Sequence, residues 1–190
     1  FDRRAKVVAI SGKDRGAILP AGHQGTAYMY MASTGQFASS THYMAEHPAW
    51  VNDFHAAKPA DRYFKTQWTP LLPEAAYARS LPDRQTWFAK GGGLPMAMNA
   101  PDDEAPGPVY YGALLRSPFG DAAIDGEQLG QDDVPDILSI SLSGHDYVNH
   151  AFGAESRISH DHLLQLDRLF QAFFNDLDER VGANNYLAVL

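Results

Sequence analysis

Asp146 and His150 lie four positions apart in the segment S-G-H-D-Y-V-N-H at 143–150, directly after a predicted buried strand at 137–142. If the segment is helical, one turn places both side chains on the same face. A carboxylate and an imidazole can occupy adjacent corners of a tetrahedral zinc site, but two ligands do not complete it. The alternative is a helix-capping aspartate followed by an unrelated histidine, because this spacing is common.

Lys13 and Arg15 alternate in the segment S-G-K-D-R-G at 11–16, which also follows a predicted buried strand, residues 6–11. In an extended backbone both side chains would point the same way. Lysine supplies a mobile point charge, and arginine supplies a planar fork that binds two phosphoryl oxygens together. The pair therefore predicts a phosphate-binding loop. The alternative is a solvated loop in which Asp14 pairs locally.

The composition limits what kind of site the chain can hold. Its 190 residues are 45% hydrophobic, which suits one domain or a large piece of one. The net charge of -8 argues against nucleic acid as a specific partner, so an anionic substrate would need local cations. The sequence has no cysteine, so a transition metal must be bound by His, Asp or Glu. No apolar run is long enough to predict a membrane span.

Hydrophobic patterning predicts the elements that position these motifs. Beside the two strands already named, residues 28–31 and 36–41 predict a hairpin. A long amphipathic helix is predicted after residue 156, begun by a Ser156 or Ser159 cap and ended at Gly182. Its apolar face comprises Leu163, Leu166, Phe170, Phe173, Leu177 and Val181. Residues 185–190 predict a further strand, and this strand–helix–strand order implies a right-handed crossover in a parallel sheet.

Residues 42–108 differ from the rest of the chain because they are rich in aromatic residues, proline and glycine. We expect an irregular insertion that packs through its rings and could cover a site or shape its entrance. The predicted α/β fold therefore consists of core segments at 1–41 and 109–190 with a crown-like subdomain between them.

Several further motifs, together with the two charged ones, carry a family resemblance. They are V-V-A-I-S-G-K-D-R-G-A-I-L-P-A-G-H at 7–23, T-G-Q-F-A-S-S-T-H-Y-M at 34–44, W-V-N-D-F at 50–54, S-P-F-G-D at 117–121, E-Q-L-G at 127–130 and S-L-S-G-H-D-Y-V-N-H-A-F-G at 141–153. In combination they resemble the alkaline phosphatase superfamily, in particular its bacterial zinc-dependent branch with a threonine nucleophile, which is type I phosphodiesterase/nucleotide pyrophosphatase-like. The resemblance implies an alkaline-phosphatase-like sandwich with a mainly parallel central sheet flanked by helices.

The resemblance also implies roles for the charged residues. Asp146 and His150 match the aspartate and histidine that bind one of the family's two zinc ions. Lys13 and Arg15 match the cations that contact the phosphate oxygens. The intact parent would hydrolyse small phosphate monoesters, with one zinc activating the nucleophile and the other taking the leaving oxygen. The resemblance implies a periplasmic or secreted enzyme and no particular oligomeric state.

Other parts of the family pattern are expected outside this chain. The threonine nucleophile would precede it, and an Asp-His ligand pair would follow residue 190. We therefore expect an internal fragment that is catalytically incompetent alone. The alternative function is a phosphodiesterase or nucleotide pyrophosphatase of the same superfamily, which needs room for a second substituent where Lys13 and Arg15 reach.

Overall fold

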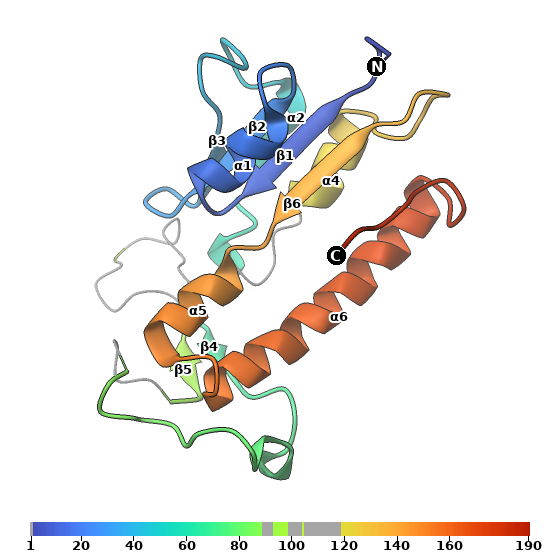
Figure 1. The fold of residues 1–190 in the computed structure, drawn as a ribbon. Helices are drawn as coiled ribbons and strands as arrows, with labels where there is room; N and C mark the ends of the chain where they lie inside the picture. Colours follow the sequence, from blue (N-terminus) through green and yellow to red (C-terminus); the bar gives the residue numbers. More distant parts are fainter. Residues whose placement is uncertain (1, 89–92, 99–103, 105–118) are drawn as a thin grey trace.

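The centre of the molecule is a twisted four-stranded sheet in the order β3-β2-β1-β6 (Figure 1). The computed structural model describes residues 2–88, 93–98, 104 and 119–190. The strands are β1 (Val7–Ser11), β2 (Thr26–Met31), β3 (Gln36–Ala38) and β6 (Ile137–Ser141). β1 pairs in parallel with both β2 and β6, whereas β2 and β3 form the predicted antiparallel hairpin. The expectation of a mainly parallel sheet is confirmed.

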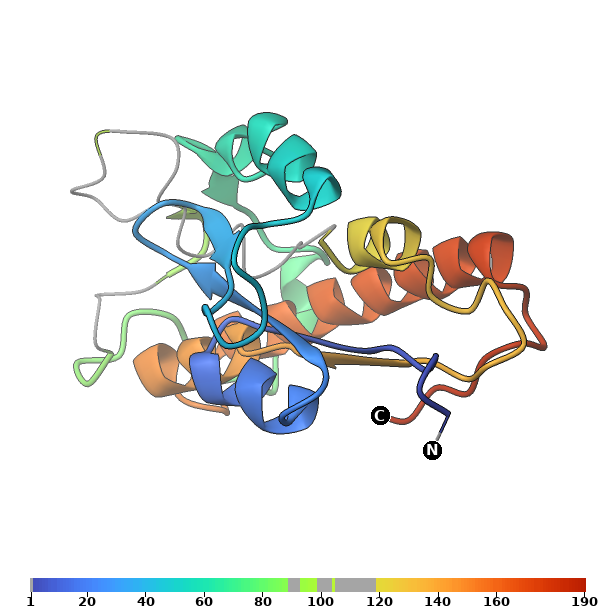
Figure 2. The same cartoon turned by 90° about the horizontal axis from the view of Figure 1, so that it is seen from above.

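Side chains alternate between the two faces of β1, and each face is covered by different helices. Ala9 lies in a small cluster with Ala17 and Ala21 of α1 (Asp14–Ala21). Val8 and Ile10 lie in the main core, which α2 (Ala49–Ala56) and α4 (Phe119–Gly126) complete. Figure 2 shows α1 on one side of the sheet and α2 and α4 on the other.

The predicted insertion contains only short regular elements among its described residues. Besides α2 these are the 3-10 turns η1 (Asp61–Tyr63) and η2 (Glu74–Tyr77) and the antiparallel pair β4 (Gln67–Trp68) and β5 (Met96–Ala97). The ring of Trp68 joins a second core cluster with side chains of the two helices that follow β6. Three internal ranges lie outside the described residues: 89–92, 99–103 and 105–118. They include parts of the predicted insertion, of the predicted core segment and of the 117–121 motif.

Two helices follow β6: α5 (Gly144–Phe152) and the long α6 (Arg157–Arg180). Ser156 caps α6, because its hydroxyl accepts a hydrogen bond from the Ser159 backbone N–H at 3.0 Å. Gly182 follows the helix with φ of 98°, a conformation that favours glycine. The predicted start and stop of this helix are confirmed. No helix among the described residues is long and apolar enough to cross a membrane.

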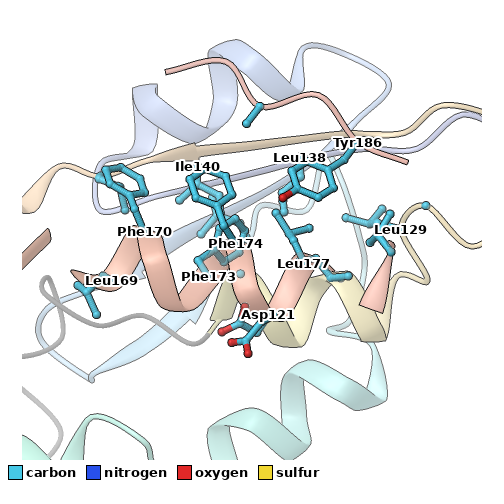
Figure 3. A pocket seen from close by; sticks show the side chains of 18 of the residues that line it. Asp121, Leu129, Leu138, Ile140, Leu169, Phe170, Phe173, Phe174, Leu177 and Tyr186 are labelled. Atoms are coloured by element: carbon cyan, nitrogen blue, oxygen red, sulfur yellow. The ribbon is translucent and has the colours of Figure 1, made fainter. Parts of the chain in front are cut away.

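The prediction of a strand at 185–190 is wrong, because this segment pairs with none of the strands in the described part of the chain. Leu187, Val189 and Leu190 are 88%, 85% and 91% exposed. The segment runs along a groove between β6 and α6, where Phe170, Phe174 and Leu177 point toward β6 and Tyr186 (Figure 3). An apolar run of β-forming residues favours a strand, but a strand also needs a hydrogen-bonded partner. The crossover predicted from β6 to this segment is therefore not formed.

Candidate functional site

The two motifs meet because β1 and β6 are neighbours that end together. Ser11 and Ser141 are the last residues of these strands and lie opposite each other in the parallel register. α1 begins just beyond β1, and α5 begins just beyond β6. Because the two strands end side by side, the helices that follow them begin at the same edge of the sheet. This carboxyl edge of a parallel sheet is where α/β proteins bind ligands.

Asp146 and His150 lie on one face of α5, as the four-residue spacing predicts. His150 Nε2 is 3.6 Å from Asp146 Oδ1. The His150 side chain is 78% exposed and the Asp146 side chain is 49% exposed, so both are accessible to a ligand. A carboxylate oxygen and an imidazole nitrogen suit zinc, so the donor pair fits the expected metal. No group of three or more metal-binding side chains occurs among the described residues, so the described part of the chain supplies an incomplete site.

Lys13 reaches across from the start of α1 to α5. Its Nζ contacts Asp146 Oδ2 and lies 4.8 Å from the centre of the Tyr147 ring. The hydrogen bond from Lys13 is the largest cause that lowers the pKa of Asp146. Burial opposes this shift, whereas the charges of Lys13, His150 and Arg15 support it. Asp146 therefore lies between the ammonium group of one motif and the imidazole of the other.

Arg15 is placed differently from the expectation of an extended loop. Only Lys13 has extended backbone, with φ of -129° and ψ of 140°, because α1 starts at Asp14. Arg15 is exposed in the first turn of α1. Asp14 accepts a hydrogen bond from the Arg15 backbone N–H at 2.7 Å, so an acidic side chain stabilises the start of the helix. The extended alternation predicted for the two cations is wrong, although both belong to the start of one helix.

Sequence analysis missed a histidine contact behind α5. His145 Nδ1 and His162 Nδ1 are 3.1 Å apart, so one ring donates and the other accepts. Burial is the main cause that lowers the pKa of both histidines, to about 4 for His162. His162 lies outside the predicted apolar face of α6 and is nevertheless only 2% exposed. The signal was available only in three dimensions, because the two residues lie on different helices.

A buried carboxylate ties the insertion to α6. Asp161 is fully buried and accepts hydrogen bonds from Trp68 Nε1 at 2.5 Å, Leu71 N at 2.7 Å and Tyr77 Oη at 2.5 Å. Its neighbour His162 contacts the Trp68 ring edge-on, with ring centres 5.7 Å apart. The insertion, α6 and the helix that carries Asp146 are thus packed against one another.

Comparisons with known proteins agree with the fold. Residues 5–190 match the family described as type I phosphodiesterase / nucleotide pyrophosphatase. The chain is 41% identical to alkaline phosphatase PafA of Elizabethkingia meningoseptica over 200 residues and 40% identical to alkaline phosphatase PhoV of Synechococcus elongatus over 201 residues. Each of these comparisons covers 98% of this chain but 36% of the relative's length.

The solved structures most informative here are those of PafA. The crystal structure of wild-type PafA matches 96% of this chain and 37% of that chain, with a TM-score of 0.79 and 38% identity. This match confirms the alkaline-phosphatase-like fold. A PafA variant, matched at the same TM-score of 0.79 and 37% identity, carries alanine in place of a lysine and an arginine two positions apart. Lys13 and Arg15 have the same spacing.

Proposed function

This chain belongs to the type I phosphodiesterase / nucleotide pyrophosphatase family, and we propose that the protein containing it hydrolyses phosphate monoesters. The observation that carries the proposal is the meeting of Lys13 from α1 with Asp146 and His150 from α5 beyond two adjacent parallel strands. Similarity to PafA and PhoV, which are alkaline phosphatases, supports the assignment.

Lys13 and Arg15 are the phosphate-binding residues in this proposal. A phosphate monoester dianion has three unsubstituted oxygens and two negative charges, whereas a phosphate diester has two unsubstituted oxygens and one negative charge. The additional oxygen gives a second cation a partner, so two cations near the start of one helix favour the monoester. The start of α1 adds the positive end of the helix dipole to these charges. Arg15 binds through its fork, and Lys13 contributes a point charge.

Asp146 and His150 would hold one of the two zinc ions that the family resemblance implies. Zinc, when bound, supplies Lewis-acid polarisation of phosphoryl and attacking oxygens. Asp146 remains ionised over a wide pH range, because Lys13 lowers its pKa. The side chain can therefore accept from Lys13 and present its other oxygen toward His150. This arrangement orients the ammonium group of Lys13 beside the proposed metal position.

The test compares Arg15→Ala and Lys13→Ala with wild type in the full-length protein that contains this chain. Substrates are p-nitrophenyl phosphate and its bis ester. A hydrogen bond to a charged group is worth about 1.5–3 kcal/mol, so each variant should lose about 10- to 150-fold in kcat/KM for the monoester. The loss for the diester should be much smaller. Arg3→Ala, which removes an exposed cation before the opposite end of β1, is the control.

Equal losses on the two substrates would contradict the monoester assignment. They would favour the second candidate, a phosphodiesterase or nucleotide pyrophosphatase, which the description of the matching family includes. The exposure of Arg15 is compatible with a second substituent at this position. A wild-type protein that prefers the bis ester would establish this alternative.

The 190 residues alone are proposed to be catalytically incompetent. They span 36% of the length of the curated relatives and contain two of the expected zinc ligands. The purified fragment, loaded with zinc, should release no p-nitrophenol above background, and measurable turnover would overturn this proposal. Similarity to alkaline phosphatases also supports a periplasmic or secreted parent, which fractionation of the source cells would test.

A further inference from the structure

A buried hydroxyl pair connects the two halves of the candidate site. Ser11 Oγ and Ser143 Oγ are 3.1 Å apart, and either oxygen can be the donor. The residues are 2% and 8% exposed. Ser11 ends β1, and Ser143 precedes α5, so this hydrogen bond joins the carboxyl edges of β1 and β6, from which Lys13 and Asp146 follow.

Ser143 does not use its hydroxyl as a serine at this position normally would. It occupies the N-cap position of α5, where serine usually accepts a hydrogen bond from the first turn. Here the side chain makes no such bond, and the backbone lies at φ of -64° and ψ of -10°. The hydroxyl is directed to Ser11 instead. The start of α5 is therefore linked to β1 at the expense of a local cap.

Ser11 transmits this link to the cationic motif. Its Oγ accepts a hydrogen bond from the Lys13 backbone N–H at 3.0 Å. α1 passes so close that a Cβ added to Gly16 would lie 2.4 Å from Ser11 Oγ and 2.9 Å from Ser141 Oγ. The hydroxyl is thus enclosed by α1, and its position fixes the backbone from which the Lys13 side chain extends.

We propose that Ser11 and Ser143 are positioning residues that hold the phosphate-binding cations of α1 in register with the Asp146 and His150 helix. The inference rests on the proposed function, since it concerns the alignment of the same site. The role of the two serines is to fix the backbone from which the Lys13 side chain reaches Asp146, so that the cations stay beside the position proposed for the phosphoryl group.

The experiment uses Ser143→Ala in the full-length protein, with zinc supplied. The loss of one net hydrogen bond should raise the inhibition constant for inorganic phosphate about fivefold and lower monoester kcat/KM by a similar factor. The effect on bis(p-nitrophenyl) phosphate should stay below about twofold, because the diester depends less on the cations. Ser39→Ala is the matched control, since it removes a 2.7 Å hydrogen bond to the Ala27 carbonyl away from the site.

A double-mutant comparison separates positioning from general loss of stability. In a Lys13→Ala/Arg15→Ala background, Ser143→Ala should cause almost no further loss of phosphate affinity, because both aligned cations are already absent. Equal effects of Ser143→Ala on phosphate affinity in both backgrounds would contradict the proposal. A Ser143→Ala variant with the same phosphate affinity and monoester preference as Ser39→Ala would also contradict it. If the alanine variant does not fold, Ser143→Cys, a weaker hydrogen-bonding group of similar size, provides the same comparison.

The outcomes also distinguish this inference from the proposed function. If Lys13→Ala and Arg15→Ala impair monoester hydrolysis selectively but Ser143→Ala does not, only the positioning role is wrong. If neither cation variant acts selectively on the monoester, the proposed function fails and the positioning role fails with it.

Discussion

Removing the Asp161 carboxylate should be among the most destabilising single changes on α6. The side chain is fully buried and accepts from three donors that belong to the insertion: the Trp68 indole, the Leu71 amide and the Tyr77 hydroxyl. Asp161→Ala leaves these donors without their acceptor in a space too enclosed for full hydration. Each stranded donor costs about 1–3 kcal/mol, and these costs overlap because the donors share one partner.

We therefore expect Asp161→Ala to lower the free energy of unfolding by about 3–6 kcal/mol. The assay is urea unfolding of the full-length protein, followed by tryptophan fluorescence, since Trp68 is itself a reporter of the contact. Hydrogen exchange at the Leu71 amide supplies a local measurement, and this amide should lose its protection before the sheet does. Asp167→Ala, which removes an exposed carboxylate from the same helix, is the matched control and should change the value by less than about 0.5 kcal/mol.

A loss below about 1 kcal/mol in Asp161→Ala would refute this reasoning, because it would mean that the donors find other partners. An unchanged exchange rate at Leu71 would refute it independently. Either result would show that the insertion is held to the core by ring packing and not by the buried carboxylate.

Three further predictions concern packing and pH. Gly16→Ala should lower the free energy of unfolding by about 1–3 kcal/mol, although alanine favours helices, because its Cβ would overlap Ser11 Oγ; a more stable variant would contradict the close approach. The pKa of His162 is lowered to about 4, so the free energy of unfolding should fall by up to about 3 kcal/mol as the pH drops from 6.5 to about 4, and His162→Gln should flatten this dependence in pH-resolved urea titrations. Burial and the charge of Asp176 raise the pKa of Asp121 to about 6, so stability is lost as the pH rises from 3.8 through about 6. Asp121→Asn should therefore raise the melting temperature at pH 8 but not at pH 4, and an equal change at both values would exclude this carboxylate as the cause.

Local patterning was sufficient to predict most elements of the sheet and the long helix. β-Branched runs identified β1 and β6, and the spacing of apolar residues identified α6. The segment at 185–190 has the same apolar composition, but composition cannot show whether a partner strand is available. α1 was missed because its short sequence contains glycine and proline, whereas the fold stabilises it through buried alanine contacts with the sheet.

The candidate site was predictable only where its residues are local in sequence. Asp146 and His150 share a helix, so their spacing was sufficient to bring them together. The contact from Lys13 crosses 133 positions and depends on which strand lies beside β1, and residue spacing carries no such information. The link between Ser11 and Ser143 is equally non-local. The family resemblance supplied the connection between the two motifs, and the register of the parallel strands explains it physically.

The most direct test of the account is a crystal structure of the full-length protein with zinc and inorganic phosphate, measured with anomalous diffraction at the zinc edge. The account predicts a zinc ion bound by both Asp146 and His150, with a phosphate beside it that contacts Lys13 Nζ and the Arg15 guanidinium group. A zinc ion that touches neither α5 residue, or a phosphate bound at the metal while both cations point into solvent, would contradict it.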